Sequence, residues 1–220
     1  ATMLVFIVTD VVIENCDLSK IVEHATKNIF NNISVDGDTS TNDSFVAAAN
    51  GISNVCVGSK KTELANDWKK FKSSFFEICE FLAKSIVKDG EGATKFITIK
   101  IQNVLSNEEV YKIGNSIANS PLVKTAFFAS DPNLGRILAA IGNAGLQDLE
   151  TKKLKMSINN YTVFVYGEIV KDYSEIRAKK EMVEKEITIS VDLNRGKACG
   201  VFYTCDFSHD YVSINSDYRT

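Results

Sequence analysis

The chain of 220 residues is long enough to bury a sizeable core and suits one large domain or two small ones. Hydrophobic residues make up 45% of it, and a formal net charge of -3 without a dense Lys/Arg block gives no support for nucleic-acid binding. No apolar run approaches the roughly 20 residues that span a bilayer, and no signal peptide is apparent, so we expect no membrane partner either. Five cysteines without CxxC spacing indicate reduced, mostly buried thiols in a cytoplasmic protein.

The first ten residues, Ala1–Asp10, place a threonine beside the terminus and continue as an apolar, β-branched run. Such a run predicts a buried strand. Its position is unusual, because termini are normally polar and mobile. Two explanations stay open: a core strand whose upstream part is missing, or a terminus made by cleavage of a folded precursor. In the second case the free α-amine of Thr2 would serve as general base for its own hydroxyl.

The next segment predicts a helix over about 17–31 with Asp17 as its cap, because apolar residues recur there at helical spacing. A polar loop, DGDTSTNDS, follows at 36–44. Its aspartates resemble a calcium loop, but Thr41 and Ala47 stand where such a loop needs glycine and glutamate. We therefore expect no metal, and instead a loop whose side chains hydrogen-bond its own backbone and face a cleft.

A second short helix is predicted over about 43–50, and a long amphipathic helix over 61–88. The apolar stripe of the long helix, interpreted as core packing, consists of Leu64, Trp68, Phe71, Phe75, Ile78, Leu82 and Ile86. The helix leads into Asp89–Lys95, where glycines flank Glu91. Glycine permits close approach of the backbone to a ligand, although a lone glutamate in such a turn is more often simply solvated.

Beyond Lys95 strands and helices alternate, which predicts an α/β fold with a domain boundary near Gly90. The expected strands cover about 96–104, 122–129, 153–158, 161–170, 187–193 and 198–205. The expected helices cover about 106–118, which a capping box opens, about 131–142, and about 174–185. The last residues, 210–220, alternate apolar and polar side chains and look ordered to the end.

Five motifs are distributed over the whole chain: Ala1–Leu4 with Thr9-Asp10, the DGDTSTNDS stretch, Asp89–Lys95, Asp131–Ile137 and Ile214–Thr220. Together, and in this order, they resemble the β chain of the ornithine acetyltransferase family, the glutamate N-acetyltransferases of arginine biosynthesis. Each motif alone is weak, whereas the set is specific. Leu134 and Ser130 depart from the pattern, since a tryptophan and a glycine are usual at these positions.

The resemblance implies the α/β layered fold of this N-terminal-nucleophile family. Residues 1–90 would form a catalytic layer completed by an α chain, 91–205 a smaller α/β domain, and 206–220 a tail that returns to the active site. Family members are cytoplasmic precursors that cleave themselves between the residues matching Ala1 and Thr2, and they assemble as α2β2 heterotetramers. Because Ala1 precedes Thr2 here, the chain is either split one residue early or uncleaved.

The resemblance also implies the chemistry. Thr2 would be the nucleophile that takes an acetyl group from N-acetylornithine, forms an acetyl-threonine and passes the acetyl to glutamate. Glu91, Asn215 and Thr220 match substrate-binding residues, and we expect Glu91 to pair with a substrate ammonium. The oxyanion hole belongs to the α chain. No cofactor or metal is expected, with acetyl-CoA as an alternative acetyl donor in bifunctional members.

Two alternatives stay open at this point. An N-terminal-nucleophile amidase of the aminopeptidase type shares the self-cleavage but would lack the tail contacts of Asn215 and Thr220. A non-catalytic small-molecule-binding subunit would be cleaved only for maturation. The fate of the acetyl group separates these alternatives from a transferase.

Overall fold

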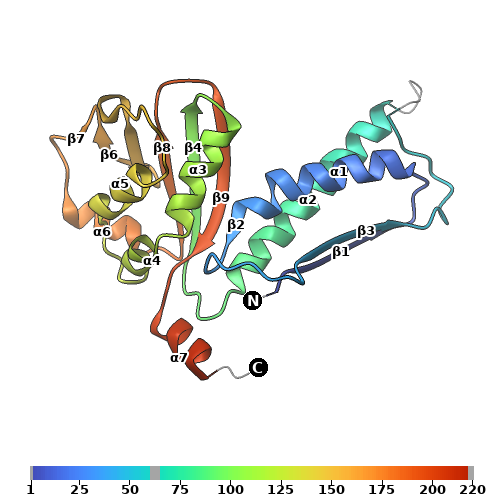
Figure 1. The fold of residues 1–220 in the computed structure, drawn as a ribbon, viewed down its shortest axis with the longest axis horizontal. Coiled ribbons are helices and arrows are strands. Elements are labelled where there is room, and N and C mark those ends of the chain that lie inside the picture. The colour runs from blue at the N-terminus through green and yellow to red at the C-terminus, as the bar shows by residue number, and fades with distance from the viewer. Residues whose placement is uncertain (1, 60–64, 218–220) are drawn as a thin grey trace. The chain divides into compact units, whose positions relative to one another are not determined.

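The computed structural model describes residues 2–59 and 65–217, which fall into two compact units (Figure 1). The units comprise residues 1–31 with 38–86, and residues 32–37 with 87–220. Both units combine helices with strands, which confirms the predicted α/β class. No helix within the described ranges is long and apolar enough to cross a membrane.

In the first unit, two helices accompany a pair of parallel strands (Figure 1). Strand β1 (Leu4–Thr9) pairs with strand β3 (Ser44–Ala49), so the opening run is a strand as predicted. Helix α1 (Asn15–Asn28) follows β1 and continues into a 3-10 turn at Phe30–Asn32. Helix α2 (Ala65–Lys88) follows β3.

The core of this unit is aromatic on one face of the strands. The ring of Phe45 contacts those of Phe30 and Phe75, with centroid separations of 4.7 and 6.3 Å. The strand β1 is not buried as predicted, because within the described residues only Val5 of this strand is buried. The apolar side chains on its other face are exposed, namely Leu4, Phe6 and Val8. This leaves an apolar surface that a further layer could cover.

The segment predicted as a short helix over 43–50 is strand β3 instead. Its run of three alanines, Ala47–Ala49, favours a helix by intrinsic propensity. Parallel pairing with β1 overrides that preference and sets Val46 opposite Phe6. The prediction was wrong because the pairing partner lies 40 residues away, out of reach of any local pattern.

Asp17 does not cap helix α1, contrary to the prediction. The helix begins at Asn15 after Glu14, which forms no side-chain cap. Asp17 is instead buried, and its carboxylate accepts hydrogen bonds from the amide and the hydroxyl of Ser59, both at 2.7 Å. It therefore anchors a distant loop to α1.

Helix α2 confirms a long amphipathic helix from Ala65 onward, while residues 61–64, with Leu64 of the predicted stripe, lie outside the described residues. The buried face is shifted from the predicted one. Ile78 is 48% exposed, whereas Cys79 beside it is fully buried. The buried side chains of the helix are Phe75, Cys79, Ala83 and Val87.

In the described part of the second unit, seven strands form one mixed sheet in the order β2-β9-β4-β8-β5-β6-β7. The pairs β2–β9 and β4–β8 are parallel, and the other neighbours are antiparallel. The strands are β2 (Ile33–Ser34), β4 (Phe96–Val104), β5 (Lys155–Ile158), β6 (Tyr161–Val165), β7 (Glu168–Ile169), β8 (Glu186–Asp192) and β9 (Ala198–Cys205).

One face of this sheet is apolar because side chains alternate along each strand. In β4, for example, Ile97, Ile99 and Ile101 are buried while Lys100 between them is exposed. Four helices pack on the apolar face and share its core. They are α3 (Asn107–Ala118), α4 (Pro121–Phe128), α5 (Leu134–Gly142) and α6 (Glu175–Met182). The helices α3 and α5 begin and end close to their predicted positions.

The segment predicted as a strand over 122–129 is helix α4. Pro121 occupies its first turn, where the missing amide hydrogen costs nothing. The hydroxyl of Ser120 accepts a hydrogen bond from the amide of Val123 and caps the helix. This Ser-Pro start signal outweighs the β-branched and aromatic content of the segment.

Two further boundaries differ from the prediction. The single strand expected over 161–170 is a hairpin of β6 and β7. Tyr166 and Gly167 form its turn with φ of 53° and 89°, and positive φ at both central residues suits a two-residue hairpin turn. Helix α6 ends at Met182, three residues before its predicted end. The final stretch forms helix α7 (His209–Asp217) within the described residues.

All five cysteines are free thiols. The expectation that most are buried was wrong, because Cys16, Cys56 and Cys199 are exposed. Burial raises the pKa of Cys79 to about 11 and also raises the pKa of Cys205. The buried pair is therefore protonated and unreactive near neutral pH.

Candidate functional site

The Gly-rich turn after α2 lies directly against the segment that leads into α7. Gly92 has φ +67°, and a Cβ added there would lie 2.4 Å from the amide nitrogen of Tyr211 and 2.8 Å from the Ser208 hydroxyl. Only glycine fits both the backbone conformation and this close approach. The turn therefore brings Glu91 next to helix α7.

Glu91 and Asn215, 124 residues apart, meet at this point. The Asn215 side-chain amide donates a hydrogen bond to Oε2 of Glu91 at 3.0 Å and one to the Tyr211 carbonyl at 2.9 Å. Glu91 is half-buried and Asn215 is exposed, so the pair borders solvent. A carboxylate and an amide side by side can hold a ligand that carries an ammonium group. Thr220, the third predicted binding residue, lies outside the described residues.

The segment before α7 is fastened to the end of the Gly-rich turn by one buried carboxylate. Asp206, 1% exposed, accepts hydrogen bonds from the amide of Thr94 at 2.8 Å, the hydroxyl of Thr94 at 2.5 Å and the amide of Lys95 at 2.8 Å. The hydroxyl of Ser208 donates to the Gly92 carbonyl at 2.5 Å. These four bonds fix where α7 starts and hence where Asn215 points.

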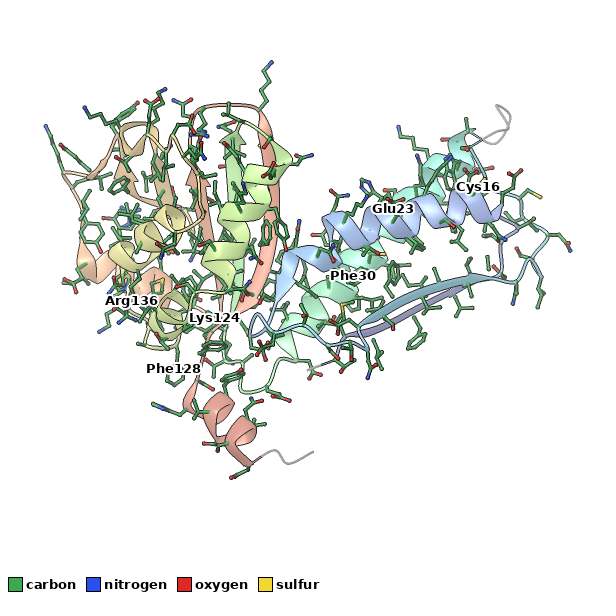
Figure 2. All side chains as sticks on the ribbon, viewed as in Figure 1. Cys16, Glu23, Phe30, Lys124, Phe128 and Arg136 are labelled. Atoms are coloured by element: carbon green, nitrogen blue, oxygen red, sulfur yellow. The ribbon has the colours of Figure 1, made fainter. Side chains whose placement is uncertain are left out.

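A fully buried lysine, Lys124, forms hydrogen bonds with the residues directly before this segment. Lys124 lies on α4 (Figure 2). Its ammonium donates to the Thr204 hydroxyl at 2.7 Å and to the Cys205 carbonyl, and it lies 4.6 Å from the ring centroid of Phe207. Burial lowers the pKa of Lys124, while Cys205 and Asp206 nearby act in the opposite direction. Lys124 therefore has a structural role, because its ammonium already donates hydrogen bonds to protein acceptors.

Lys95, the last residue of the Gly-rich turn, forms three further hydrogen bonds through its side chain. Its ammonium donates to the carbonyls of Phe127 and Met182 and to the hydroxyl of Ser130, each at 2.6 Å. Burial lowers the pKa of Lys95, and Asp206 opposes that shift. Ser130 has φ +53°, a conformation that glycine adopts without strain, so the glycine expected here from the resemblance would also fit this backbone.

Aromatic rings hold α7 in place. The rings of Phe207 and Tyr211 stack with centroids 4.5 Å apart, and the Tyr211 hydroxyl donates to Asp36 at 3.3 Å. His209 contacts Phe128 of α4 edge-on at 5.3 Å. His209 is thus a packing residue, which agrees with its absence from the predicted site.

Thr2 belongs to the first unit and is exposed at the start of β1. Its hydroxyl lies 2.9 Å from the hydroxyl of Ser40 in the DGDTSTNDS loop. The carboxylate of Asp43 accepts hydrogen bonds from the amides of Met3 at 2.7 Å and Ser40 at 3.2 Å. The loop bonds its own backbone as predicted, and it also reaches the candidate nucleophile. Ala1, the other residue of the predicted cleavage bond, lies outside the described residues.

Sequence reasoning missed Ser40, Asp43, Asp206, Ser208 and Lys124. A signal existed for the first two, since both lie in a motif that carried the family resemblance. None existed for the other three, because only the fold shows what their side chains contact. Within the described residues, no group of three His, Cys, Asp or Glu side chains could hold a metal ion.

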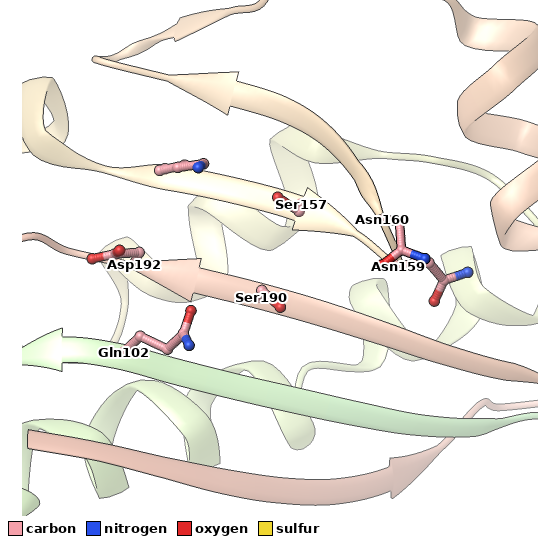
Figure 3. A pocket seen from close by; sticks show the side chains of 7 residues that line it. Gln102, Ser157, Asn159, Asn160, Ser190 and Asp192 are labelled. Atoms are coloured by element: carbon pink, nitrogen blue, oxygen red, sulfur yellow. The ribbon is translucent and has the colours of Figure 1, made fainter.

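A polar pocket of about 220 Å³ lies on the sheet face opposite the helices of the second unit (Figure 3). Its lining comes from β4, β5, β8 and the turn after β5, namely Gln102, Lys155, Ser157, Asn159, Asn160, Ser190 and Asp192. The carboxylate of Asp192 is already occupied by the Asn103 side chain and the Asn194 amide, both at 2.8 Å. None of the residues singled out from the sequence lines this pocket.

Comparison with known proteins gives concordant results. The model of the ArgJ family matches residues 1–220. Curated proteins named arginine biosynthesis bifunctional protein ArgJ from Neisseria meningitidis serogroup A and from Colwellia psychrerythraea are 45% and 46% identical. Each covers 100% of this chain, which in turn covers 54% and 53% of them, so the chain spans about half the length of these relatives.

A solved structure agrees with these matches. The crystal structure of the arginine biosynthesis bifunctional protein argJ from Bacillus halodurans superposes with a TM-score of 0.91 at 36% sequence identity. The match covers 99% of this chain and 100% of the solved one. The expected α/β fold of this family therefore has an experimental counterpart.

Proposed function

The chain belongs to the ArgJ family, and from this we propose that it is the β chain of a glutamate N-acetyltransferase of arginine biosynthesis. In this proposal the enzyme moves an acetyl group from N-acetylornithine to glutamate through an acetyl ester on Thr2. The residues assigned to it are Thr2 as nucleophile, Ala1 and Thr2 as the cleavage bond, and Glu91, Asn215 and Thr220 with Thr2 as substrate-binding residues.

The contact between Glu91 and Asn215 is the observation that carries the proposal. The family motifs assign both residues to substrate binding, yet they lie at opposite ends of the second unit's sequence. Four hydrogen bonds of Asp206 and Ser208 hold the two segments together. These bonds hold Glu91 and Asn215 in a fixed geometry, which a binding site requires and a solvated surface turn does not.

The acetyl transfer proceeds in two balanced steps. In the first, the Thr2 oxygen bonds to the acetyl carbon as the bond from that carbon to the ornithine nitrogen breaks. The hydroxyl proton passes to the free α-amine of Thr2 and from there to the departing nitrogen. In the second, the glutamate nitrogen takes the acetyl group, and its proton returns to the threonine oxygen through the same amine. An amine at Thr2 requires that Ala1 be cleaved off.

Glu91 serves the recognition of ornithine. A carboxylate attracts an ammonium, and the side-chain oxygen of the adjacent Asn215 can accept a hydrogen bond from a polar group of an amino acid, because both of its N–H donors are already bonded to Glu91 and Tyr211. No cofactor is needed for this chemistry. The name "bifunctional" carried by the relatives supports acetyl-CoA as a second acetyl donor.

An α chain from the same precursor is the proposed partner, in a cytoplasmic α2β2 heterotetramer. The exposed apolar face of β1 and β3, with Leu4, Phe6, Val8 and Val46, supports a covering layer. The solved Bacillus halodurans chain matches this chain end to end, whereas the curated relatives extend well beyond it.

Product analysis tests the proposed function. The full-length precursor is incubated with N-acetylornithine and glutamate, and N-acetylglutamate, ornithine and free acetate are quantified. We expect N-acetylglutamate and ornithine in equal amounts, with parallel lines in double-reciprocal plots. Free acetate without N-acetylglutamate would instead identify the aminopeptidase-like hydrolase, and substrate binding without turnover would identify the binding subunit. Replacing N-acetylornithine by acetyl-CoA then decides whether the enzyme is bifunctional.

A further inference from the structure

We infer that Ser40 is a positioning residue for the Thr2 nucleophile and that Asp43 fixes Ser40 for this task. The inference rests on the proposed function, since it assigns Ser40 a role in the acetylation of Thr2. It concerns the first unit alone, in which all three residues lie.

The two hydroxyls form a direct hydrogen bond, with Oγ1 of Thr2 and Oγ of Ser40 2.9 Å apart. Thr2 is exposed at the start of β1, so its side chain has few other restraints. A threonine hydroxyl can occupy alternative χ1 rotamers, and an attack on an acetyl group requires one of them. The bond to Ser40 selects one rotamer.

The donor and acceptor count allows Ser40 to be the donor in this bond, which is the direction that we propose. A hydroxyl has one hydrogen to donate and can accept two bonds. The Ser40 oxygen already accepts the amide hydrogen of Asn42 at 3.2 Å, and its own hydrogen remains for Thr2. When Ser40 donates, the proton of the Thr2 hydroxyl is left free for the base. Ser40 keeps its proton throughout the reaction and stabilises the Thr2 oxygen as that oxygen loses its own.

Asp43 makes this arrangement rigid. One oxygen of its carboxylate accepts the amide of Met3, the residue after the nucleophile, and the other accepts the amide of Ser40. The amide of Ser44 also donates to the Met3 carbonyl at 2.8 Å. The Asp43 side chain thereby holds both Ser40 and the residue that follows Thr2. The distance between the Ser40 and Thr2 hydroxyls is therefore set before substrate arrives.

The same loop offers a matched control. The Ser44 hydroxyl donates to the Asn42 carbonyl at 3.1 Å, a local loop bond without a contact to Thr2 among the described residues. Ser44→Ala removes a loop hydroxyl of the same kind as Ser40→Ala. A purely structural role of these hydroxyls predicts equal effects of the two changes, whereas positioning predicts an effect of Ser40→Ala alone. Ser40→Thr keeps the hydroxyl.

The experiment follows acetylation of Thr2 in a single turnover. Wild type, Ser40→Ala, Ser40→Thr and Ser44→Ala are expressed as full-length precursors, mixed with excess N-acetylornithine, and quenched for intact-mass analysis of the processed protein. We expect the acetylation rate of Ser40→Ala to fall by about 10- to 100-fold and the other two variants to stay near wild type. Steady-state kinetics over a range of N-acetylornithine concentrations should show an unchanged KM for Ser40→Ala.

Equal acetylation rates in wild type and Ser40→Ala, or equal losses in Ser40→Ala and Ser44→Ala, would overturn the inference. If Ser40→Ala stays unprocessed, Ser40→Thr decides, because retained acetylation supports a need for the hydroxyl and a loss as large as in Ser40→Ala contradicts it. A wild-type protein that is never acetylated refutes the proposed function itself, which is a distinct result.

Discussion

At the scale of single residues, the task that we propose for Glu91 is the most specific. Its carboxylate borders solvent and accepts a hydrogen bond from the neutral amide of Asn215, and no cationic side chain within residues 2–59 and 65–217 forms an ion pair with it. A neutral amide leaves the negative charge of the carboxylate uncompensated. In the proposed function, a substrate ammonium supplies this compensation.

Glu91→Gln should therefore raise the KM for N-acetylornithine by about 10- to 100-fold, since hydrogen bonds to charged groups contribute roughly 1.5–3 kcal/mol. Steady-state kinetics of acetyl transfer measure this change. Asp89→Asn removes an exposed carboxylate from the same turn and should leave the KM unchanged. An unaltered kcat/KM in Glu91→Gln would show that the assignment of Glu91 is wrong.

At the residue scale, the sequence predicted the groups that the family motifs name and missed those that support them. Glu91 and Asn215 could be predicted as candidates because their motifs are specific as a set. Asp206 and Lys124 could not, because a buried aspartate or lysine has no local signature. Their partners, the amides of Thr94 and Lys95 and the carbonyl of Cys205, become visible only once the chain is folded.

At the scale of elements, local signals correctly predicted helix α3, which has a capping residue, and strand β4, in which apolar and polar side chains alternate. Helix α3 begins after Ser106, whose hydroxyl accepts the amide of Glu109 as the capping box requires. Strand β3 was predicted as a helix, because parallel pairing with β1 overrides the helix preference of its alanines. Helix α4 was predicted as a strand, because its Ser-Pro start overrides the strand preference of its β-branched residues. In both cases a single non-local or terminal feature outweighs average propensity.

The contact between the Gly-rich turn and α7 can be tested at Gly92. Gly92→Ala and Gly145→Ala both place a side chain at positive φ, with φ of +67° and +74°. Each should lose about 1 kcal/mol of unfolding free energy from backbone strain. Only the Cβ at position 92 meets other atoms, since nothing lies within 4 Å of one at position 145. Gly92→Ala should in addition displace α7 and lower kcat/KM at least about 10-fold.

Urea unfolding and steady-state kinetics of both variants measure these two effects separately. The Gly145→Ala variant is expected to keep wild-type kcat/KM, because its strain lies in the loop after α5 and nothing within 4 Å meets the added side chain. Equal kcat/KM in the two variants would contradict the proposed coupling of α7 to the turn.

Helix α2 carries a pH-dependent contribution to stability. Burial raises the pKa of the Cys79 thiol from 9.0 to about 11. The unfolded chain releases this proton near pH 9.0, while the folded chain keeps it until about pH 11. The folded state thus binds more protons between these values, so its stability is fully present below pH 9.0 and is lost as the pH rises through about 11.

We therefore expect the unfolding free energy of the wild type to fall more steeply across this window than that of Cys79→Ala, by on the order of 2 kcal/mol. Urea titrations at both ends of the window measure the difference. Cys199→Ala removes an exposed thiol and should follow the wild type. A Cys79→Ala protein with the wild-type pH dependence would show that this thiol titrates normally in the folded state.

At the scale of the whole molecule, the contacts divide the chain between Ile86 and Val87 and assign residues 32–37 to the second unit. The composition of residues 32–37 does not differ from that of their neighbours in a way that indicates this assignment, so the sequence could not predict it. The candidate residues divide as well, with Thr2, Ser40 and Asp43 in the first unit and Glu91 and Asn215 in the second.

The apolar face of β1 and β3 tests the proposed α chain. Phe6 is 65% exposed, and burying a side chain of this size contributes roughly 1.5–3 kcal/mol to an interface. Phe6→Lys should reduce recovery of the α chain with a tagged β chain by about 10-fold or more after co-purification. Ile176→Lys alters an apolar residue of α6 that is 85% exposed and should have no effect. Full recovery with Phe6→Lys would place the partner elsewhere.

The acetyl-threonine is the central claim, and intact mass measures it most directly. We predict that the full-length enzyme, after N-acetylornithine alone, gains about 42 Da on the chain that begins at Thr2, and that glutamate removes this mass. Peptide mapping should place the acetyl group on Thr2 and leave Thr9, the other threonine of the opening segment, unmodified. Turnover to N-acetylglutamate without any such adduct on Thr2 would contradict the mechanism.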